Sequence, residues 1–379
     1  MQRTDAIVVG LGAHGGATAY QFAKRGLQVL GLDRFRVPHE QGSSHGESRI
    51  IREAYHEDPA YVPFVQRAYE LWADLERESG RRLFVQTGGL MIGAPTVGTF
   101  AGAKKSAELF GLKHEILESG DVHKRFPAFH LEGNERALLE HRAGALLLPA
   151  TLEAHLAGAK KHGADLRFDE PASSWSADES GVVVKTARGE YHADRLVLAA
   201  GAWLPELVPE PRIPLRVERQ VMFWFKPKKN PADFRPDRFP VFIWETEDGH
   251  NTYGFPDLGT GFKMGIHHEG EIVDPNTVDR TPSQEDERKV RRDVARCFPD
   301  ADGPAVAAKV CLYTVTPDTV FLLDHHPRHD NVIIASCCSG HGFKFASAVG
   351  EAAADLAMER RPKTDLSLFR LTRLLSRRF

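Results

Sequence analysis

Hydrophobic and polar positions follow two patterns along this chain. Short apolar runs bounded by glycine or charged residues are typical of buried parallel strands. Such runs occupy residues 5–9, 28–32, 182–184, 196–200 and 332–336, and residues 83–92 and 144–149 are also strand-like. Longer stretches that mix apolar and charged residues predict helices. We expect helices over residues 17–25, 61–80, 101–110, 120–127, 150–162 and 347–358.

A different pattern fills the second half of the chain. Residues 217–225, 241–246, 251–255 and 262–267 are rich in apolar and aromatic side chains and are separated by turn residues. This arrangement predicts a largely antiparallel sheet. Because apolar runs of the parallel type lie on both sides of this block, we expect an α/β protein. We expect the parallel-sheet part of the chain to be interrupted by an inserted, largely antiparallel layer.

Glycines at a fixed spacing follow the first apolar run. Gly10, Gly12 and Gly15 fit the pattern G-x-G-x-x-G, and the next run ends at Asp33. Such glycines allow a tight turn, a close approach of the backbone to a pyrophosphate and close packing of a helix on a strand. The order of strand, glycines, helix, strand and acid predicts a dinucleotide site in which Asp33 binds the ribose hydroxyls. The pattern does not choose between NAD and FAD.

A further glycine, Gly201, follows the apolar run 196–200. A residue without a side chain at the end of a strand allows a cofactor to approach the backbone. The alternative is an ordinary turn from a strand into a helix. The sequence supports both interpretations equally.

Composition narrows the class of protein. The 379 residues carry a net charge of −3, which gives no electrostatic footprint for nucleic acid. No apolar stretch is long enough to span a bilayer, and the short N-terminal run is needed as the first strand rather than as a signal peptide. The four cysteines do not form a disulfide framework, which favours a reducing cytoplasm. The histidines lack metal-ligand spacing, so we expect no metal.

Five further segments carry unusual clusters of residues. They are residues 44–52, 253–256, 262–267, 311–314 and 339–345. Together with the glycine fingerprint, and in this order, they resemble the monomeric sarcosine oxidase family, which includes N-methyltryptophan, pipecolate and fructosyl-amino-acid oxidases. The resemblance implies an FAD-binding domain of the glutathione-reductase type and an inserted α+β catalytic domain built on a large mixed, mainly antiparallel sheet. It also implies a monomer.

The resemblance divides the chain between these two domains. It places residues 1–86, 143–212 and 317–379 in a discontinuous FAD-binding domain. It places residues 87–142 and 213–316 in the substrate domain.

For the cofactor, the resemblance implies FAD attached through a thioether between Cys311 and the 8α carbon of the flavin. A buried, inert thiol is the alternative that the residue alone favours. Arg49 matches a residue at the flavin face, and His45 matches a histidine that tunes the flavin ring. The remaining positions expected near the cofactor are Ser44, Gly340, Gly342 and Lys344.

For the substrate, the resemblance implies that Arg52 and Lys344 bind a carboxylate. Two cations suit the carboxylate of a zwitterionic amino acid in a desolvated pocket. Lys263 matches the lysine over the flavin, where a fixed cation would stabilise negative charge as oxygen is reduced. His267 matches the histidine beside the substrate amine, and for His45 and His267 alone a structural role is the alternative.

The wall of the pocket is expected to include Tyr253, Ile243 and Trp244. Two neighbouring residues depart from the family. Cys337 and Cys338 stand where the family has glycine and an aromatic residue, which affects the volume of the pocket.

The expected function is FAD-dependent oxidation of sarcosine or another N-alkyl or secondary α-amino acid, with oxygen as the acceptor. The imine hydrolyses and hydrogen peroxide is released. One alternative is an FAD-dependent dehydrogenase that passes electrons to a different acceptor. Another is a non-enzymatic nucleotide-binding subunit, which would need the glycine fingerprint but not the downstream clusters.

Overall fold

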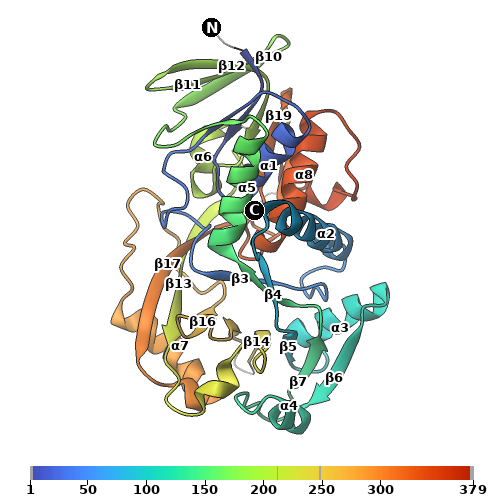
Figure 1. Ribbon diagram of the computed structural model, residues 1–379, viewed down its shortest axis with the longest axis vertical. Helices are drawn as coiled ribbons and strands as arrows, with labels where there is room; N and C mark the ends of the chain where they lie inside the picture. Colours follow the sequence, from blue (N-terminus) through green and yellow to red (C-terminus); the bar gives the residue numbers. More distant parts are fainter. Residues whose placement is uncertain (1–2, 211, 247–248, 376–379) are drawn as a thin grey trace.

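The structure, a computed structural model, describes residues 3–210, 212–246 and 249–375. Two large sheets dominate this part of the chain, one in the upper half and one in the lower half of Figure 1. Beside the upper sheet lie helices α1, α2, α5 and α8, and beside the lower sheet lie α3, α4 and α7.

The upper sheet has a parallel centre. Its strand β1 pairs in parallel with β2 and β12, β12 pairs in parallel with β19, and β2 with β9. Antiparallel strands β10, β11 and β18 extend it. The strands are β1 (Arg3–Val9), β2 (Val29–Leu32), β9 (Asp165–Arg167), β10 (Ser174–Asp178), β11 (Gly181–Thr186), β12 (Gly189–Leu198), β18 (Leu322–His326) and β19 (His329–Ser336).

Both faces of the upper sheet are covered, which explains its continuous apolar runs. Ala6 and Val8 pack in one hydrophobic cluster with helices α1, α2, α5 and α8, whereas Ile7 and Val9 pack in another with α6 and α9. The helices are α1 (Ala13–Lys24), α2 (Tyr61–Ser79), α5 (Leu148–Lys161), α6 (Leu204–Leu207), α8 (Ala346–Ala357) and α9 (Thr372–Leu375).

The lower sheet has the order β17-β13-β16-β15-β14-β5-β7-β6. Its neighbours are antiparallel except for the parallel pair β14 and β5. The strands are β5 (Gly89–Gly93), β6 (His114–Glu118), β7 (Arg136–Glu140), β13 (Arg216–Phe225), β14 (Val241–Glu245), β15 (Asn251–Phe255), β16 (Phe262–Ile266) and β17 (Ala305–Val315). This confirms the expected large, mixed and mainly antiparallel sheet.

The lower sheet presents different side chains on its two faces. Phe242 and Trp244 pack with Val290 and Val294 of α7 in an aromatic core. Residues of the opposite face, such as Ile243, line a cavity instead. The helices of this half are α3 (Gly98–Phe110), α4 (Ser119–Arg125) and α7 (Gln284–Cys297).

A small sheet joins the two halves. It contains β3 (Ser48–Ile51), β8 (Gly144–Leu147) and β4 (Phe84–Gln86) in that order. Strand β3 forms part of the segment 44–52 and lies between the upper and lower sheets in Figure 1. The expected domain boundaries remain a prediction.

Helix α1 begins earlier than expected from the sequence, and helices α6, α7 and α9 were not expected. Helix α1 begins at Ala13, four residues before the expected start at position 17, so the fingerprint residue Gly15 and its neighbour Gly16 lie within its first turn. Helix α7 was not predicted, although its N-terminus carries a signal. The Ser283 side chain accepts from the backbone N–H of Asp286, and Asp286 accepts in return from the backbone N–H of Ser283. This reciprocal pair is a capping box.

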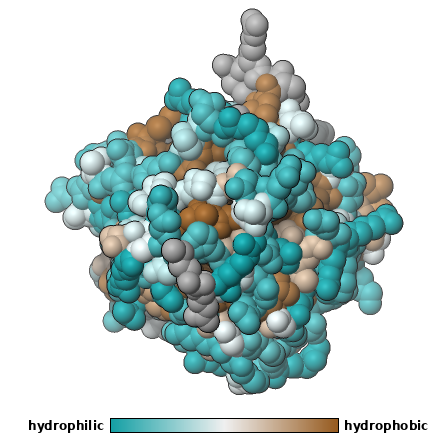
Figure 2. Space-filling view, turned by 90° about the horizontal axis from the view of Figure 1, so that it is seen from above, coloured by the Kyte–Doolittle hydropathy of each residue, from teal (hydrophilic) through white to brown (hydrophobic). Residues whose placement is uncertain are grey.

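The face of the molecule at the end that carries β10 to β12 is predominantly hydrophilic (Figure 2). Seen from the end that carries β10 to β12, hydrophobic residues form small, separate patches (Figure 2). Within the described ranges, no helix combines the length and the apolar character needed to cross a membrane.

Candidate active site

A cavity of about 490 Å³ runs from the carboxyl ends of β1 and β2 to the inner face of the lower sheet. Side chains from both halves of the chain therefore meet around it. The sequence-predicted residues that line it are Gly10, Gly12, Asp33, Ser44, Arg49, Arg52, Gly201, Ile243, Tyr253, His267, Cys311, Gly340, Gly342 and Lys344. His45, Lys263 and Gly15 are not part of the lining.

The glycine fingerprint forms the turn that its spacing predicts. Gly10 has a φ of +90°, and a Cβ added there would lie 2.5 Å from the carbonyl oxygen of Ala199. A Cβ on Gly15 would lie 1.7 Å from the carbonyl oxygen of Gly10. Gly15 therefore serves the close packing of helix on strand, while Gly10 and Gly12 border the cavity.

Polar groups at this end suit a dinucleotide. The Asp33 carboxylate accepts from the backbone N–H groups of Leu11 (2.6 Å) and Phe35 (2.9 Å), which fixes its orientation at the cavity wall. Burial raises the pKa of Asp33, and these two hydrogen bonds oppose the shift. The Ser44 hydroxyl accepts from the N–H of Ala13 at the start of α1, at 3.1 Å. Helix N-termini favour anions such as a pyrophosphate.

Gly201 begins a short 3-10 helix directly after β12 and has a φ of +54°. A Cβ there would meet no atom within 4 Å, and the residue lines the cavity. Gly201 therefore makes the turn into this helix, and its expected role beside a cofactor remains a prediction.

Cys311 lies against the Arg49 guanidinium. Arg49 Nη2 is 3.6 Å from Cys311 Sγ and donates to the carbonyl oxygen of Ser43 at 3.0 Å. Burial raises the pKa of the Cys311 thiol, and Arg49 opposes this shift. A neighbouring cation of this kind favours the thiolate, the nucleophilic form of cysteine.

Lys263 lies behind the wall of the cavity. Its ammonium donates to the carbonyl oxygens of Gly46 (2.9 Å) and Ser48 (2.8 Å), the same two oxygens that accept from Arg49. The side chain is fully buried, with Nζ 4.4 Å from the ring centroid of Phe255. Burial lowers the pKa of Lys263 well below its usual value, and Arg49 adds to this shift. An anion next to the Lys263 side chain would stabilise the protonated, positively charged form of this lysine.

The two predicted histidines differ in position. Burial lowers the pKa of His45 to about 3, with Arg49 adding to the shift, and the ring lies outside the cavity lining. His267 borders the cavity, and its Nδ1 is 3.3 Å from the Tyr313 hydroxyl. Burial lowers the pKa of His267 well below its usual value, so the ring is neutral near pH 7.

The pocket wall contains Ile243 and Tyr253, which are cross-strand partners on β14 and β15. The expectation for Trp244 is wrong. Successive side chains of a strand point to opposite faces, so Trp244 packs in the aromatic core, where its Nε1 donates to Glu135 at 2.8 Å. Of the two neighbouring cysteines, Cys338 lines the cavity, whereas Cys337 is buried and points its Sγ at the carbonyl oxygen of Leu322.

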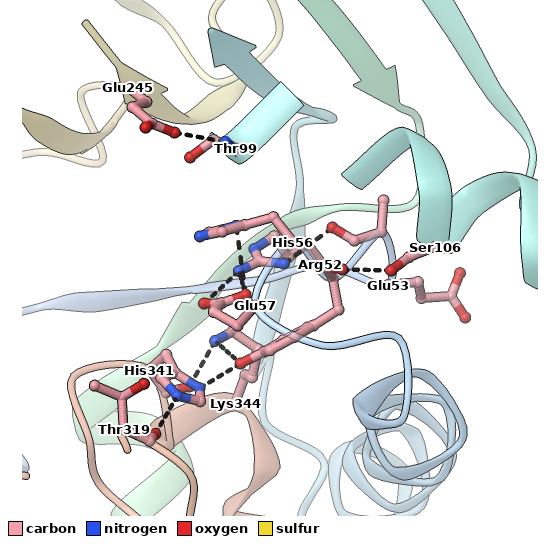
Figure 3. Close-up of polar contacts among 12 residues, drawn as sticks. Arg52, Glu53, His56, Glu57, Thr99, Ser106, Glu245, Thr319, His341 and Lys344 are labelled. Carbon is pink, nitrogen blue, oxygen red and sulfur yellow. Dashed lines mark hydrogen bonds and ion pairs between the residues drawn. The ribbon is translucent and has the colours of Figure 1, made fainter. Parts of the chain in front are cut away.

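Arg52 and Lys344 meet at the far end of the cavity, and both side chains are buried (Figure 3). Arg52 Nη2 donates to both carboxylate oxygens of Glu57, at 2.8 and 2.6 Å. Lys344 Nζ donates to the carbonyl oxygen of His341 at 2.6 Å. The two predicted cations are thus brought together, and an internal carboxylate faces one of them.

These charges shift one another's pKa values. Burial lowers the pKa of Lys344 to about 7, Arg52 adds to the shift and Glu57 opposes it. Burial raises the pKa of Glu57, but Arg52 and its neighbours outweigh this effect and hold that pKa well below the usual range. At neutral pH the cluster therefore holds a charged Arg52, a charged Glu57 and a Lys344 that is only partly protonated.

Sequence reasoning missed several residues of this cluster. Glu57, His56 and His341 all line the cavity. Only His341 lay in a segment with a sequence signal, because it belongs to residues 339–345. The sequence around Glu57 carries no signal, because only the folded structure shows that Glu57 is the partner of Arg52.

A second hollow lies beyond Glu57. His56, Glu57 and Asn251 border both spaces, and the second one extends to the N-terminus of α3. There Glu245 accepts from the backbone N–H of Thr99 at 2.6 Å (Figure 3). The pair His56 and Glu57 therefore stands between the two spaces.

The geometry defines a class of protein: an oxidoreductase that places a dinucleotide between a parallel nucleotide-binding sheet and a second, antiparallel sheet. The residues present fit FAD. One cavity is lined by the backbone turn at Gly10 and Gly12, by Asp33 and by Gly201, where no atom would oppose a Cβ. The same cavity reaches Cys311 and the two cations.

Comparison with known proteins supports this class. Residues 5–356 match the family model described as DAO, FAD dependent oxidoreductase. Monomeric sarcosine oxidase from Streptomyces avermitilis is 41% identical over 374 residues, which cover 98% of this chain and 97% of that protein. N-methyl-L-tryptophan oxidase from Salmonella agona is 35% identical, covering 97% and 98%. A crystal structure of NikD, an unusual amino acid oxidase essential for nikkomycin biosynthesis, superposes with a TM-score of 0.85 at 25% identity, covering 98% of both chains.

The chain belongs to the FAD-dependent oxidoreductase family, in the group that contains the monomeric sarcosine oxidases and the N-methyl-L-tryptophan oxidases. The family expected from the sequence is confirmed, and so are the fold class and FAD as the cofactor. The roles of single residues remain predictions.

Proposed function

We propose that this protein oxidises the C–N bond of sarcosine or a related N-alkyl or secondary α-amino acid, using FAD and oxygen. The product imine hydrolyses to an amino acid and an aldehyde, and hydrogen peroxide is released. One observation carries the proposal: two buried cations, Arg52 and Lys344, lie in the same cavity as the neutral His267.

The cations select for a carboxylate. Desolvated Arg52 and Lys344 would leave their charge poorly compensated without an anion, because Glu57 satisfies only part of it. A substrate carboxylate would supply charge-assisted hydrogen bonds of about 1.5–3 kcal/mol each. The substrate would thereby be oriented with its amine toward the centre of the cavity.

His267 suits the amine end of the substrate. Its low pKa keeps the ring neutral, so it does not repel an amine and can hold or accept a hydrogen bond there. Tyr253, whose ring lies edge-on to His267 with 6.2 Å between centroids, closes this side of the pocket. The amine must be unprotonated to react, and a neutral, partly apolar surrounding favours that form.

FAD, when bound, accepts a hydride equivalent from the substrate and passes the electrons to oxygen. We further propose that Cys311 holds FAD covalently, supported by the Arg49 guanidinium 3.6 Å from Sγ. Lys263 is the proposed source of positive charge during the reduction of oxygen. Its buried place directly behind the Gly46 and Ser48 carbonyls supports this role.

A peroxide-coupled screen tests the activity. Sarcosine, pipecolate, proline, N-methyltryptophan and fructosyl amino acids would each be compared with the same compound lacking its carboxylate. We expect peroxide from at least one amino acid and little from its decarboxylated counterpart. Equal turnover of both would show that the assignment of Arg52 and Lys344 is wrong.

An artificial electron acceptor in the same assay separates an oxidase from a dehydrogenase. Reduction of the dye by an amino acid, without peroxide in air, would favour a dehydrogenase. We also propose that the protein is a cytoplasmic monomer, in keeping with its four free cysteines and with the name of its sarcosine oxidase relatives. Light scattering of the purified protein tests the monomer.

A further inference from the structure

Tyr55 contacts both of the cations at the end of the cavity. The Arg52 guanidinium carbon lies 4.2 Å from the centroid of the Tyr55 ring, and Lys344 Nζ lies 5.2 Å from it. Lys344 Nζ also donates to the Tyr55 hydroxyl at 3.4 Å. Tyr55 is fully buried and does not line the cavity, so it can act on a substrate only through these two side chains.

We propose that Tyr55, held in place by His341, is a positioning residue that sets the arrangement of Arg52 and Lys344 for binding a substrate carboxylate. This inference rests on the proposed function, because it assumes that the two cations bind a carboxylate. It assigns the selectivity for carboxylates in part to a side chain that never touches the substrate.

His341 fixes the hydroxyl end of Tyr55. The Tyr55 hydroxyl and His341 Nδ1 are 2.5 Å apart, and His341 Nε2 lies 3.2 Å from the carbonyl oxygen of Thr319. Because a carbonyl can only accept, Nε2 carries the proton, and Nδ1 accepts from the Tyr55 hydroxyl. Figure 3 shows the bond from His341 to Thr319 beside Lys344.

Aromatic packing fixes the ring of Tyr55. It stacks on Tyr61 with 4.8 Å between centroids and an interplanar angle of 29°. The His341 ring stacks on Phe321 at 4.6 Å. The hydroxyl is therefore anchored through His341 in a distant part of the chain, and the ring is anchored on Tyr61 at the start of α2.

The physical need for such a support follows from the charges. Arg52 and Lys344 are two like charges in a desolvated site, and both side chains have many rotamers in the absence of a partner. A cation is attracted to the face of an aromatic ring, and the attraction increases when water is excluded. One rigid ring that attracts both cations opposes their mutual repulsion. It also holds the two side chains in place before the substrate binds, which lowers the entropy cost of binding.

The test uses the flavin-loaded enzyme and two matched ligands. Butyrate has the length of sarcosine and its carboxylate but no amine, and butyramide is its neutral counterpart. Their dissociation constants are measured by calorimetry for the wild type, Tyr55→Phe, Tyr55→Leu and Tyr61→Phe. Tyr61→Phe is the control, because it removes a hydroxyl from the neighbouring ring of the same aromatic stack.

We expect Tyr55→Leu to weaken butyrate binding about 100-fold, because it removes the ring from both cations. Tyr55→Phe keeps the ring and should weaken butyrate binding about 5- to 10-fold, through the lost hydroxyl. Butyramide binding, and turnover at saturating substrate, should stay within about threefold of wild type in every variant. The Tyr61→Phe control should change neither ligand by more than about threefold.

Several outcomes would overturn the inference. They are butyrate binding unchanged in both Tyr55 variants, an equal loss for butyramide, or an equal loss in the Tyr61→Phe control. If Tyr55→Leu fails to retain flavin, the Tyr55→Phe result decides. A wild-type enzyme that binds butyrate no better than butyramide would instead refute the proposed carboxylate site itself, which distinguishes the two failures.

Discussion

The charge of Lys344 should make the binding of carboxylates depend on pH. Burial and the neighbouring Arg52 lower the pKa of Lys344 to about 7. Raising the pH removes the proton from Lys344, and the neutral amine then gives up most of its attraction for an anion. The affinity for butyrate should therefore be highest at low pH and should fall as the pH rises through about 7.

The size of this effect follows from two numbers. With a pKa of about 7, the charged fraction of Lys344 falls from about nine in ten at about pH 6 to about one in a hundred at about pH 9. The charge-assisted hydrogen bond that is lost contributes about 1.5–3 kcal/mol, which is about 10- to 150-fold in affinity. The loss should level off at the affinity of a Lys344→Met variant, because Arg52 remains charged throughout.

Calorimetric titrations with butyrate across this pH range measure the effect, since butyrate has no amine that titrates. The variant Lys344→Met should bind weakly and without pH dependence. Glu140 needs a control, because burial raises its pKa to about 7 and it lies near Arg52. The pH dependence should persist in Glu140→Gln. A flat profile in the wild type, or an unchanged profile in Lys344→Met, would refute the reasoning.

Three further predictions concern residues in or directly behind the cavity wall. Denaturation in acid should leave flavin bound to the wild-type protein and release it from Cys311→Ala; fully extractable wild-type flavin would contradict the attachment. The variant Lys263→Met should slow reoxidation about 100- to 1000-fold but leave anaerobic reduction nearly unchanged, as measured by rapid mixing; equal losses in both half-reactions would be inconsistent with this role. Glu57→Gln should tighten butyrate binding about tenfold at about pH 6, because the competing internal carboxylate becomes neutral; weaker binding would indicate that Glu57 mainly orders Arg52.

The nucleotide-binding half was predictable because its signals are local. Apolar runs buried on both faces identify parallel strands without knowledge of their partners. The backbone turn at Gly10 and the packing at Gly15 need glycine for steric reasons that act within a few residues. The family expectation also succeeded, because several segments matched in the right order along the chain.

Two local signals in the sequence indicate features that differ from the sequence-based expectation. The capping box at Ser283 marks the start of α7 in the sequence itself. Trp244 was assigned to the pocket although Ile243, its neighbour on the same strand, was assigned there too. The alternation of side chains along β14 allows only one of them to face the cavity.

The charge balance of the site was decided by the tertiary structure alone. The sequence supplied Arg52 and Lys344 as a pair but gave no sign that Glu57 faces one of them. Tyr55 and His341 are 286 positions apart, yet their side chains form a hydrogen bond behind the cavity wall. Contacts of this kind depend on how the helices and sheets pack, and no spacing within one segment records them. The sequence by itself thus determined the fold, the cofactor and the chemical type of the site. The packing decided which charges are buried together, and therefore their pKa values.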